Sequence, residues 1–170
     1  MTQDMGTADQ QTSRADRAEG LFRRGCNCSQ SVFAAFADLY GIDFETAMRV
    51  SASFGAGIGR MRETCGAACG LFMLAGLYDS ATAPEDKEAK SRNYKLVQEL
   101  AAKFKERNGH LKCSLMLGTL AEKTISPVAQ ERTAEYYKKR PCPHIVHEAA
   151  AIWEEFIAEN GLTRPQMKQE

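Results

Sequence analysis

Apolar side chains recur every three to four positions along most of the chain, and this spacing places them on one face of an α-helix. Asn, Asp, Gly and Pro residues interrupt the pattern where helices start and stop. No segment alternates between apolar and polar positions as a half-buried strand would, and no internal repeat is present. The predicted helices cover about 13–24, 27–41, 43–52, 64–78, 85–108 and 143–160, with shorter turns or helices near 113–118 and between 127 and 139. We therefore expect an all-α, single-domain bundle of about six to seven helices.

The segment over about 64–78 differs from the other predicted helices because it contains no charged residue. A helix that is apolar on all sides is normally surrounded by other helices, so this segment is predicted to be the buried centre of the bundle. The long helix over about 85–108 is charged over most of its surface and carries a single apolar stripe. That stripe is predicted to consist of Tyr94, Val97, Leu100, Ala101 and Phe104.

The chain of 170 residues is long enough for one domain with a sizeable core. We place this helical domain at 13–160, between an N-terminal tail over 1–12 and a C-terminal tail over 161–170, both expected to be disordered. The 22 basic residues balance 22 acidic ones, so charge gives no reason to expect nucleic acid or an anionic membrane as partner. No segment approaches the roughly 20 apolar residues that cross a bilayer, and the N-terminus lacks the apolar core of a secretory signal. A cytoplasmic protein without membrane insertion is the expectation.

The sequence contains six cysteines, for which a reducing compartment favours metal binding or redox chemistry over structural disulfides. Several follow signals for the start of a helix: Asn27 and Thr64 are candidate N-caps, and Pro143 marks an early helical position. Unpaired N–H groups and the positive end of the helix dipole favour thiolate over thiol at such places. Arg60 and Arg62 lie just before Cys65 and would add positive potential there if they fold back. The cysteines at or near helix starts are Cys28, Cys65, Cys113 and Cys142.

Cys65 and Cys69 lie one turn apart and share a face of the predicted central helix. On a regular helix their Cβ atoms are roughly 5–6 Å apart, whereas a disulfide needs about 3.5–4.5 Å. The two thiols could therefore ligate one metal but could not bond to each other. Gly66 and Gly70 thin one flank of the same helix, which lets either a neighbouring backbone or a flat ligand approach closely. This flank is also a candidate dimer face.

Cys142 falls in line with the apolar stripe of the last helix and is predicted to point inward. His144 and His147 fall on the opposite face, and His110 lies in a glycine turn, so these histidines are expected at the surface. The alternative interpretation of each cysteine is a small buried hydrophobe. The GAGIGR segment over 55–60 is a further candidate, for an anion or nucleotide site, although no strand precedes it.

Four stretches occur in an order that resembles the C-GCAxxG-C-C family of redox-active proteins, over about 21–157. These stretches read GCNCSQSVFAAF, GAGIGRMRETCGAACGLFMLAG, KCSLMLG and PCPHIVHEAA. The resemblance implies redox activity without specifying a reaction. It also implies four key cysteines, with three small residues completing the central motif. The family label places glycine before the cysteine, whereas here the cysteine precedes the glycine. The cysteines are Cys28, Cys65, Cys113 and Cys142, the small residues are Gly66, Ala67 and Gly70, and Cys26 and Cys69 are additional to the family pattern.

Two classes of function are consistent with these cysteines. The first is a cysteine-based redox protein, either an oxidoreductase or an electron carrier, that acts with a separate redox partner protein. It would cycle a dithiol and a disulfide, with Cys65 as nucleophile and a partner among Cys28, Cys113 and Cys142, or hold an iron–sulfur cluster through the same four thiolates. The second is a non-catalytic module in which zinc or copper ties the helices together, with Cys69 as a further candidate ligand.

Overall fold

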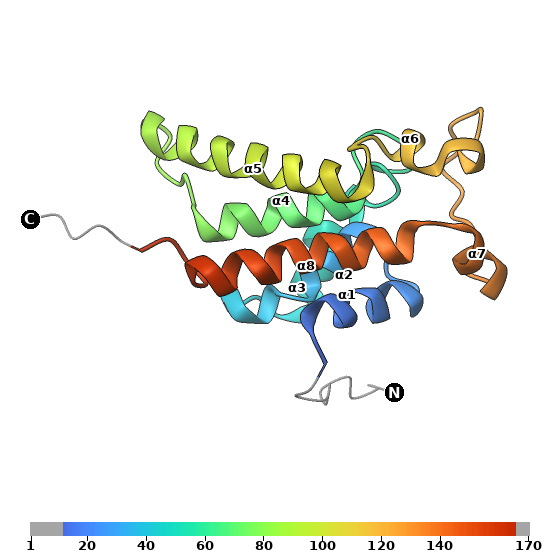
Figure 1. The fold of residues 1–170 in the computed structure, drawn as a ribbon, viewed down its shortest axis with the longest axis horizontal. Coiled ribbons are helices and arrows are strands. Elements are labelled where there is room, and N and C mark those ends of the chain that lie inside the picture. The colour runs from blue at the N-terminus through green and yellow to red at the C-terminus, as the bar shows by residue number, and fades with distance from the viewer. Residues whose placement is uncertain (1–11, 166–170) are drawn as a thin grey trace, which may run out of the picture.

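The computed structural model describes residues 12–165, and within that range every regular element is helical (Figure 1). The predicted all-α, single-domain bundle is thus confirmed for the described residues. The predicted tail over 1–12 and the end of the tail over 161–170 lie largely outside them. The elements are α1 (Arg14–Arg23), α2 (Cys28–Ala34), η1 (Ala37–Tyr40), α3 (Phe44–Ser51), η2 (Ala52–Phe54), α4 (Gly66–Tyr78), α5 (Lys87–Asn108), α6 (Cys113–Leu117), η3 (Gly118–Leu120), α7 (Ala134–Lys139) and α8 (Cys142–Asn160).

Side-chain caps fix the starts of the first three helices where the sequence predicts them. Ser13 accepts a hydrogen bond from the backbone N–H of the first turn of α1, and Asp43 does the same for α3. At α2, Asn27 and Gln30 form a reciprocal capping box, in which each side chain accepts from the other residue's backbone N–H. The capping box holds the start of α2, and therefore Cys28, in a fixed position.

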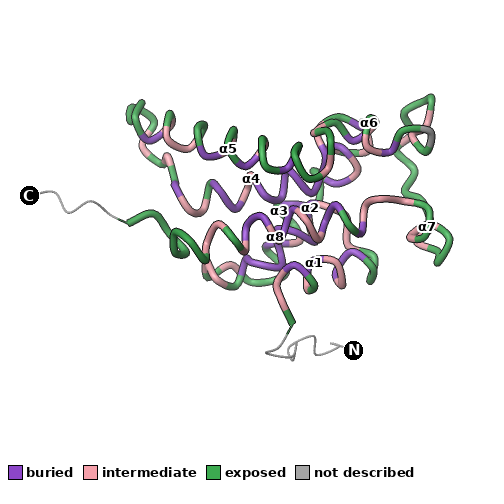
Figure 2. The backbone as a smooth tube through the Cα atoms, viewed as in Figure 1, coloured by how far each residue is buried: buried purple, intermediate pink, exposed green. Residues whose placement is uncertain are grey.

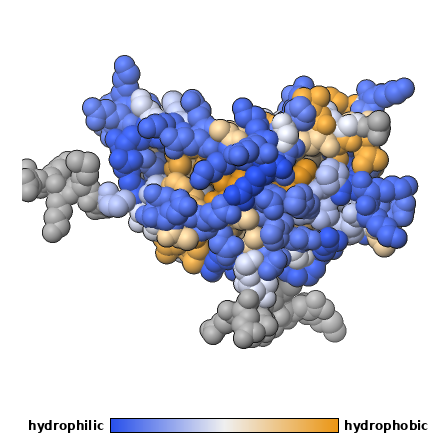
Figure 3. All heavy atoms as spheres, viewed as in Figure 1, coloured by the Kyte–Doolittle hydropathy of each residue, from blue (hydrophilic) through white to orange (hydrophobic). Residues whose placement is uncertain are grey.

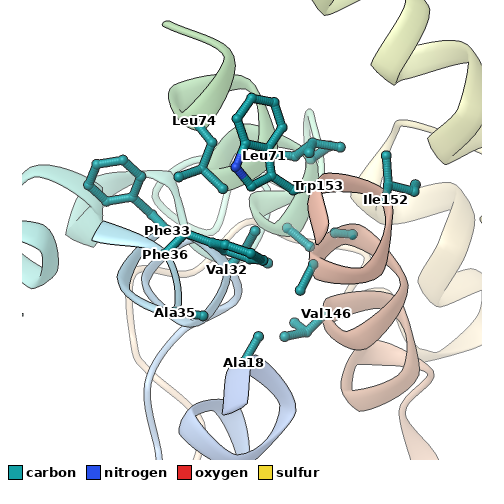
Figure 4. Packing of buried hydrophobic residues seen from close by; sticks show 14 of the residues in the cluster. Ala18, Val32, Phe33, Ala35, Phe36, Leu71, Leu74, Val146, Ile152 and Trp153 are labelled. Atoms are coloured by element: carbon teal, nitrogen blue, oxygen red, sulfur yellow. The ribbon is translucent and has the colours of Figure 1, made fainter. Parts of the chain in front are cut away.

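Helix α4 lies between α5 and α8 in the bundle, and α2 packs against it more extensively than any other helix does (Figure 1). Helix α1 covers α8 on the other side. The buried positions follow the inward faces of these helices, and α5 exposes most of its outer surface (Figure 2). The interior is filled from α2, α4 and α8, whose large side chains point toward one another (Figure 4). The largest of them with essentially no exposed surface are Trp153, Phe36, Leu71, Leu74 and Ile152.

Helix α5 packs through a narrower stripe than the sequence predicts. Leu96, Leu100 and Phe104 are buried at four-residue intervals, whereas Tyr94, which we expected on the stripe, is 61% exposed. The difference arises because α5 is an outer helix that contacts α4 and α8 along one line only. Tyr94 lies six positions before Leu100, the middle residue of that line, and therefore points about 120° away from it. No helix within residues 12–165 is long and apolar enough to span a membrane.

The chain between α6 and α8 is less regular than the rest. Of the segment predicted as helix between 127 and 139, only Ala134–Lys139 is helical, because Thr133 caps it and the preceding residues are extended. The visible surface is mostly hydrophilic, and apolar side chains gather on it over α6, where Leu115 is exposed (Figure 3). This end of the bundle, where α2, α4, α6 and α8 all begin, contains the cysteines.

Candidate functional site

Four cysteines from distant parts of the chain line one small cavity. The cavity measures about 20 Å³, which is room for one occupant the size of a water molecule. Two of the thiols are deeply buried, with 5% and 8% of the residue exposed, and the other two are half-buried. The buried pair is Cys65 and Cys113, and the half-buried pair is Cys28 and Cys142. The remaining wall is apolar or small and consists of Gly66, Ala67, Met116, Leu117, Ile145 and Val146.

The half-buried pair stands at two helix N-termini. Cys28 is the first residue of α2 and Cys142 is the first residue of α8, where Pro141 and Pro143 set the start of the helix. Free backbone N–H groups and the positive dipole end of each helix therefore lie next to these two sulfur atoms. The packing of α2 on α8 brings the two starts together at the cavity.

A short backbone bridge brings the buried pair together. The N–H of Cys65 donates to the carbonyl of Leu111 over 2.7 Å, and the N–H of Cys113 donates to the carbonyl of Glu63 over 2.6 Å. Thr64, which we predicted to be the N-cap of the central helix, takes part in this bridge, and Cys65 itself is the N-cap. The correction has a physical cause: the backbone pairing with the segment at Lys112 includes Thr64, so α4 begins one residue later than predicted, at Gly66.

The glycine flank of α4 is filled by the protein itself. A Cβ atom at Gly66 would lie 2.7 Å from the carbonyl oxygen of Phe54, and one at Gly70 would lie 2.9 Å from the carbonyl oxygen of Ser29. Both distances are too short for any side chain, so these glycines let α2 and the turn after η2 approach α4. The same close approach carries Cys28 to the cavity.

The turn before α4 has an uncommon backbone. Five consecutive residues over 56–60 adopt positive φ angles, and Arg62 adopts one as well. For non-glycine residues, a left-handed conformation costs roughly 1–2 kcal/mol each. Contacts to the cysteine cluster hold the turn in place: a Cβ atom at Gly57 would lie 2.7 Å from the Cβ atom of Cys113 and 2.7 Å from the Cα atom of Arg62. The strained turn therefore packs directly against the site.

Arg62 folds back to Cys113, whereas we expected it to act on Cys65. Its side chain is buried, and its positive charge acts on the Cys113 thiol. Its Nη2 atom also donates to Glu122 over 2.8 Å, and Arg60 pairs with the same carboxylate. Burial raises the pKa of Cys113, and the guanidinium of Arg62 opposes that rise. The hydrogen bond from Arg62 is the main reason that the pKa of Glu122 is lowered.

The four thiols differ in their readiness to ionise. The pKa of Cys142 is lowered to about 7, mainly by a hydrogen bond from the Cys28 thiol. Burial opposes this lowering, and the charge of Arg140 adds to it. The pKa of Cys28 is raised in turn, by donation of its proton to Cys142 and by burial. Burial raises the pKa of Cys65 to about 12. Cys142 is therefore the thiol of the cluster whose pKa is lowered, while those of Cys28, Cys65 and Cys113 are raised.

Several candidates from the sequence lie apart from the cavity. Cys69 is buried in α4, with its sulfur 3.9 Å from the carbonyl oxygen of Thr64, and burial raises its pKa to about 11. Cys26 is half-buried and does not line the cavity. Among the described residues, no three His, Cys, Asp or Glu side chains are placed to hold one metal ion. His110 and His144 are exposed and His147 is half-buried, beside Asp16.

Two arginines near the site escaped the sequence analysis. Arg140 and Arg132 both lower the pKa of Cys142 by their charge. The position of Arg140, two residues before Cys142, was a usable signal, because a cation beside a cysteine at a helix start stabilises the thiolate. Arg132 gave no local signal, since only the path of the chain before α7 places it at the site.

Residues 26–156 match a protein family described as "Putative redox-active protein (C_GCAxxG_C_C)". This match confirms the resemblance found in the sequence and covers every cysteine of the chain. No curated protein and no solved structure matches the chain.

Proposed function

The chain belongs to the C_GCAxxG_C_C family of putative redox-active proteins, and from this premise we propose that it is a thiol–disulfide redox protein. In this proposal Cys142 is the attacking thiolate and Cys28 is the second cysteine of the couple. The observation that carries the proposal is the placement of Cys28 and Cys142, each the first residue of a helix, on one small cavity, where Cys28 is the main cause that lowers the pKa of Cys142 to about 7.

Cys142 combines the properties of an attacking thiol. A thiol reacts fastest when its pKa is close to the ambient pH, because a lower pKa weakens the thiolate as a nucleophile and a higher one leaves it protonated. Cys142 is also half-buried, whereas Cys65 is buried. The sequence favoured Cys65 for this role, but its burial and its pKa of about 12 keep it protonated at neutral pH.

The proposed reaction is a thiol–disulfide exchange in two steps. The Cys142 thiolate attacks one sulfur of a disulfide substrate, forms a mixed disulfide and releases the other half of the substrate as a thiolate. Cys28 then attacks the Cys142 sulfur, which forms the Cys28–Cys142 disulfide and releases the second half of the substrate, and the Cys28 proton passes to the departing sulfur. In sum, two cysteine thiols are oxidised to one disulfide, and one substrate disulfide is reduced to two thiols.

A second candidate is a thiolate-bound metal ion or iron–sulfur cluster, favoured by the convergence of four cysteines on one cavity. In the described arrangement no three of these thiols are placed to hold one ion, so this candidate requires the sulfur atoms to move closer together. Metal and inorganic sulfide analysis of protein purified without oxygen separates the two candidates. Iron with sulfide, or stoichiometric zinc or copper, would favour the metal site.

Mapping of the disulfide formed by oxidation tests the first proposal. We expect that reduced protein treated with 2-hydroxyethyl disulfide, alkylated and digested shows a peptide pair linked through Cys28 and Cys142. The Cys142→Ser variant should lose that reaction, and Cys28→Ser should stop at the mixed disulfide on Cys142. Cys26→Ala is the matched control, because Cys26 is half-buried in the same segment but does not line the cavity. A linkage between other cysteines, or none, would contradict the proposal.

A further inference from the structure

A second and larger cavity opens beside the cysteine pair. It measures about 310 Å³, at the lower end of the range for small-molecule sites, roughly 300–1,000 Å³. One wall is the strained turn, through Gly55, Ala56 and Gly59, and the opposite wall is the chain before α7 together with Tyr136. Most of the GAGIGR segment, which the sequence analysis identified as a candidate anion site, lines this cavity.

Positive charge dominates the walls of this second cavity. Three guanidinium groups line it, those of Arg60, Arg62 and Arg132. One carboxylate, Glu122, pairs with the first two. Within residues 12–165 no carboxylate pairs with Arg132, whose Cζ atom instead lies 4.7 Å from the ring centroid of Tyr136. The cavity therefore has more positive charge than its own carboxylate can neutralise.

Two guanidinium nitrogens at this cavity are buried without a hydrogen-bond partner in the protein. They are Nε of Arg62 and Nη1 of Arg132. Arg62 is only 7% exposed, so its donor is removed from bulk water. Buried donors without acceptors are uncommon in folded proteins and point to an acceptor that the protein itself does not supply. A carboxylate is suited to the role, because guanidinium groups bind carboxylates through paired, charge-assisted hydrogen bonds.

The cavity adjoins the redox pair on two sides. Asn27, the residue before Cys28, lines it. Arg132 lines the cavity, and its charge lowers the pKa of Cys142, so one guanidinium that lacks a carboxylate belongs to the cavity and acts on the proposed nucleophile. The proposal below requires a short molecule, anchored by an anionic group in the cavity, to extend its other end to Cys142.

We propose that this second cavity binds a carboxylate of the disulfide substrate, so that the substrate class is small disulfides bearing carboxylates. The inference rests on the proposed thiol–disulfide function, because it assigns the substrate of the same site. Arg132 holds the carboxylate, and the buried Nε of Arg62 completes the set of donors. The exchange itself follows the two steps given above, with the anchored half of the substrate released last.

The test compares two disulfides that differ only in charge: 3,3′-dithiodipropionic acid and its neutral diamide. The wild-type protein should react about tenfold faster with the diacid, within the range by which a charged cleft accelerates the arrival of an oppositely charged ligand. In Arg132→Gln this ratio should fall to about one, and Arg132→Lys should retain part of it. The ratio cancels any change in the intrinsic reactivity of Cys142, on which Arg132 also acts.

Arg140→Gln is the matched control for charge. Arg140 lowers the pKa of Cys142 as Arg132 does, but it does not line the second cavity. This variant should slow both reagents equally and leave their ratio unchanged. Equal rates for the two reagents on the wild-type protein, or equal losses of the ratio in Arg132→Gln and Arg140→Gln, would overturn the carboxylate site.

Binding of suberate gives a readout that needs no thiol chemistry. Suberate is the all-carbon analogue of the diacid, so calorimetry should show saturable binding to the wild-type protein and to Arg140→Gln, and none to Arg132→Gln. Suberate binding without formation of the Cys28–Cys142 disulfide would support the carboxylate site and contradict the redox function. The disulfide without suberate binding or a rate preference would support the redox function and overturn the carboxylate site.

Discussion

Removal of the Cys28 thiol should change the reactivity of Cys142 in opposite directions at neutral and at high pH. The hydrogen bond from Cys28 is the largest cause that holds the pKa of Cys142 at about 7, below its ordinary value of 9.0. In Cys28→Ala this donor is absent, so the pKa of Cys142 should rise toward the ordinary value. Two effects on the rate then oppose each other, because fewer molecules are ionised but each thiolate is a stronger nucleophile.

The magnitude follows from the shift of about two pH units. At pH 7 the ionised fraction of Cys142 falls from about one half to about one hundredth, a loss of about 50-fold. With a Brønsted exponent of about 0.45, the intrinsic reactivity of the thiolate rises about eightfold. The variant should therefore react about sixfold more slowly than the wild type at pH 7. Near pH 10 both proteins are largely ionised, so the variant should react about sevenfold faster, and the two pH–rate profiles should cross.

The assay follows the loss of free Cys142 thiol with a small neutral disulfide between pH 5 and pH 10, by acid quenching, alkylation and peptide mass spectrometry. Cys28→Ser retains a hydroxyl donor and should give a smaller shift than Cys28→Ala. Cys26→Ala should reproduce the wild-type profile, because Cys26 is not among the groups that act on Cys142. Profiles of the wild type and Cys28→Ala that coincide, or that differ by a constant factor without a shift, would refute the reasoning.

Two pairs of glycine variants test the packing that builds the site, each by the change in urea midpoint. Gly70→Ala should destabilise the fold by about 1–3 kcal/mol, because its Cβ atom would lie 2.9 Å from the backbone of α2. Gly76 has open space around it, so Gly76→Ala should stabilise the fold by about 0.5–1 kcal/mol. Equal midpoints for these two variants would mean that α2 and α4 are less closely packed than described. Gly59→Ala should cost about 1 kcal/mol for its left-handed conformation alone, and Gly57→Ala should cost about 1–3 kcal/mol more because its Cβ atom would collide with the site. A larger loss for Gly59→Ala than for Gly57→Ala would contradict the packing of the turn against the cysteines.

Local features of the sequence determined the helical elements. The three-to-four-residue spacing of apolar side chains and the capping residues act over a single turn, so they predict where α1, α2 and α3 begin without knowledge of the rest. The absence of charge over 64–78 also predicted burial of α4. The order of the cysteine motifs predicted the family.

Local reasoning failed where a residue's partner lies far along the chain. Thr64 has an N-cap side chain, but the bridge to Lys112 takes it away from α4. Tyr94 continues the apolar pattern of α5, but the contact line with α4 and α8 passes through Leu96. The spacing of apolar residues within a helix predicts roughly which side of the helix is buried. The neighbouring helices then decide which residues on that side they cover.

The proposed choice of the reactive thiol rests on tertiary structure. The sequence favoured Cys65, although Cys142 also lies near a helix start with an arginine close by. In the fold, burial is the main cause that raises the pKa of Cys65. The pKa of Cys142 is lowered by Cys28, which is distant in the sequence, and by the charge of two arginines. Desolvation and hydrogen bonding depend on distances of a few ångströms between groups that only the packing of helices brings together.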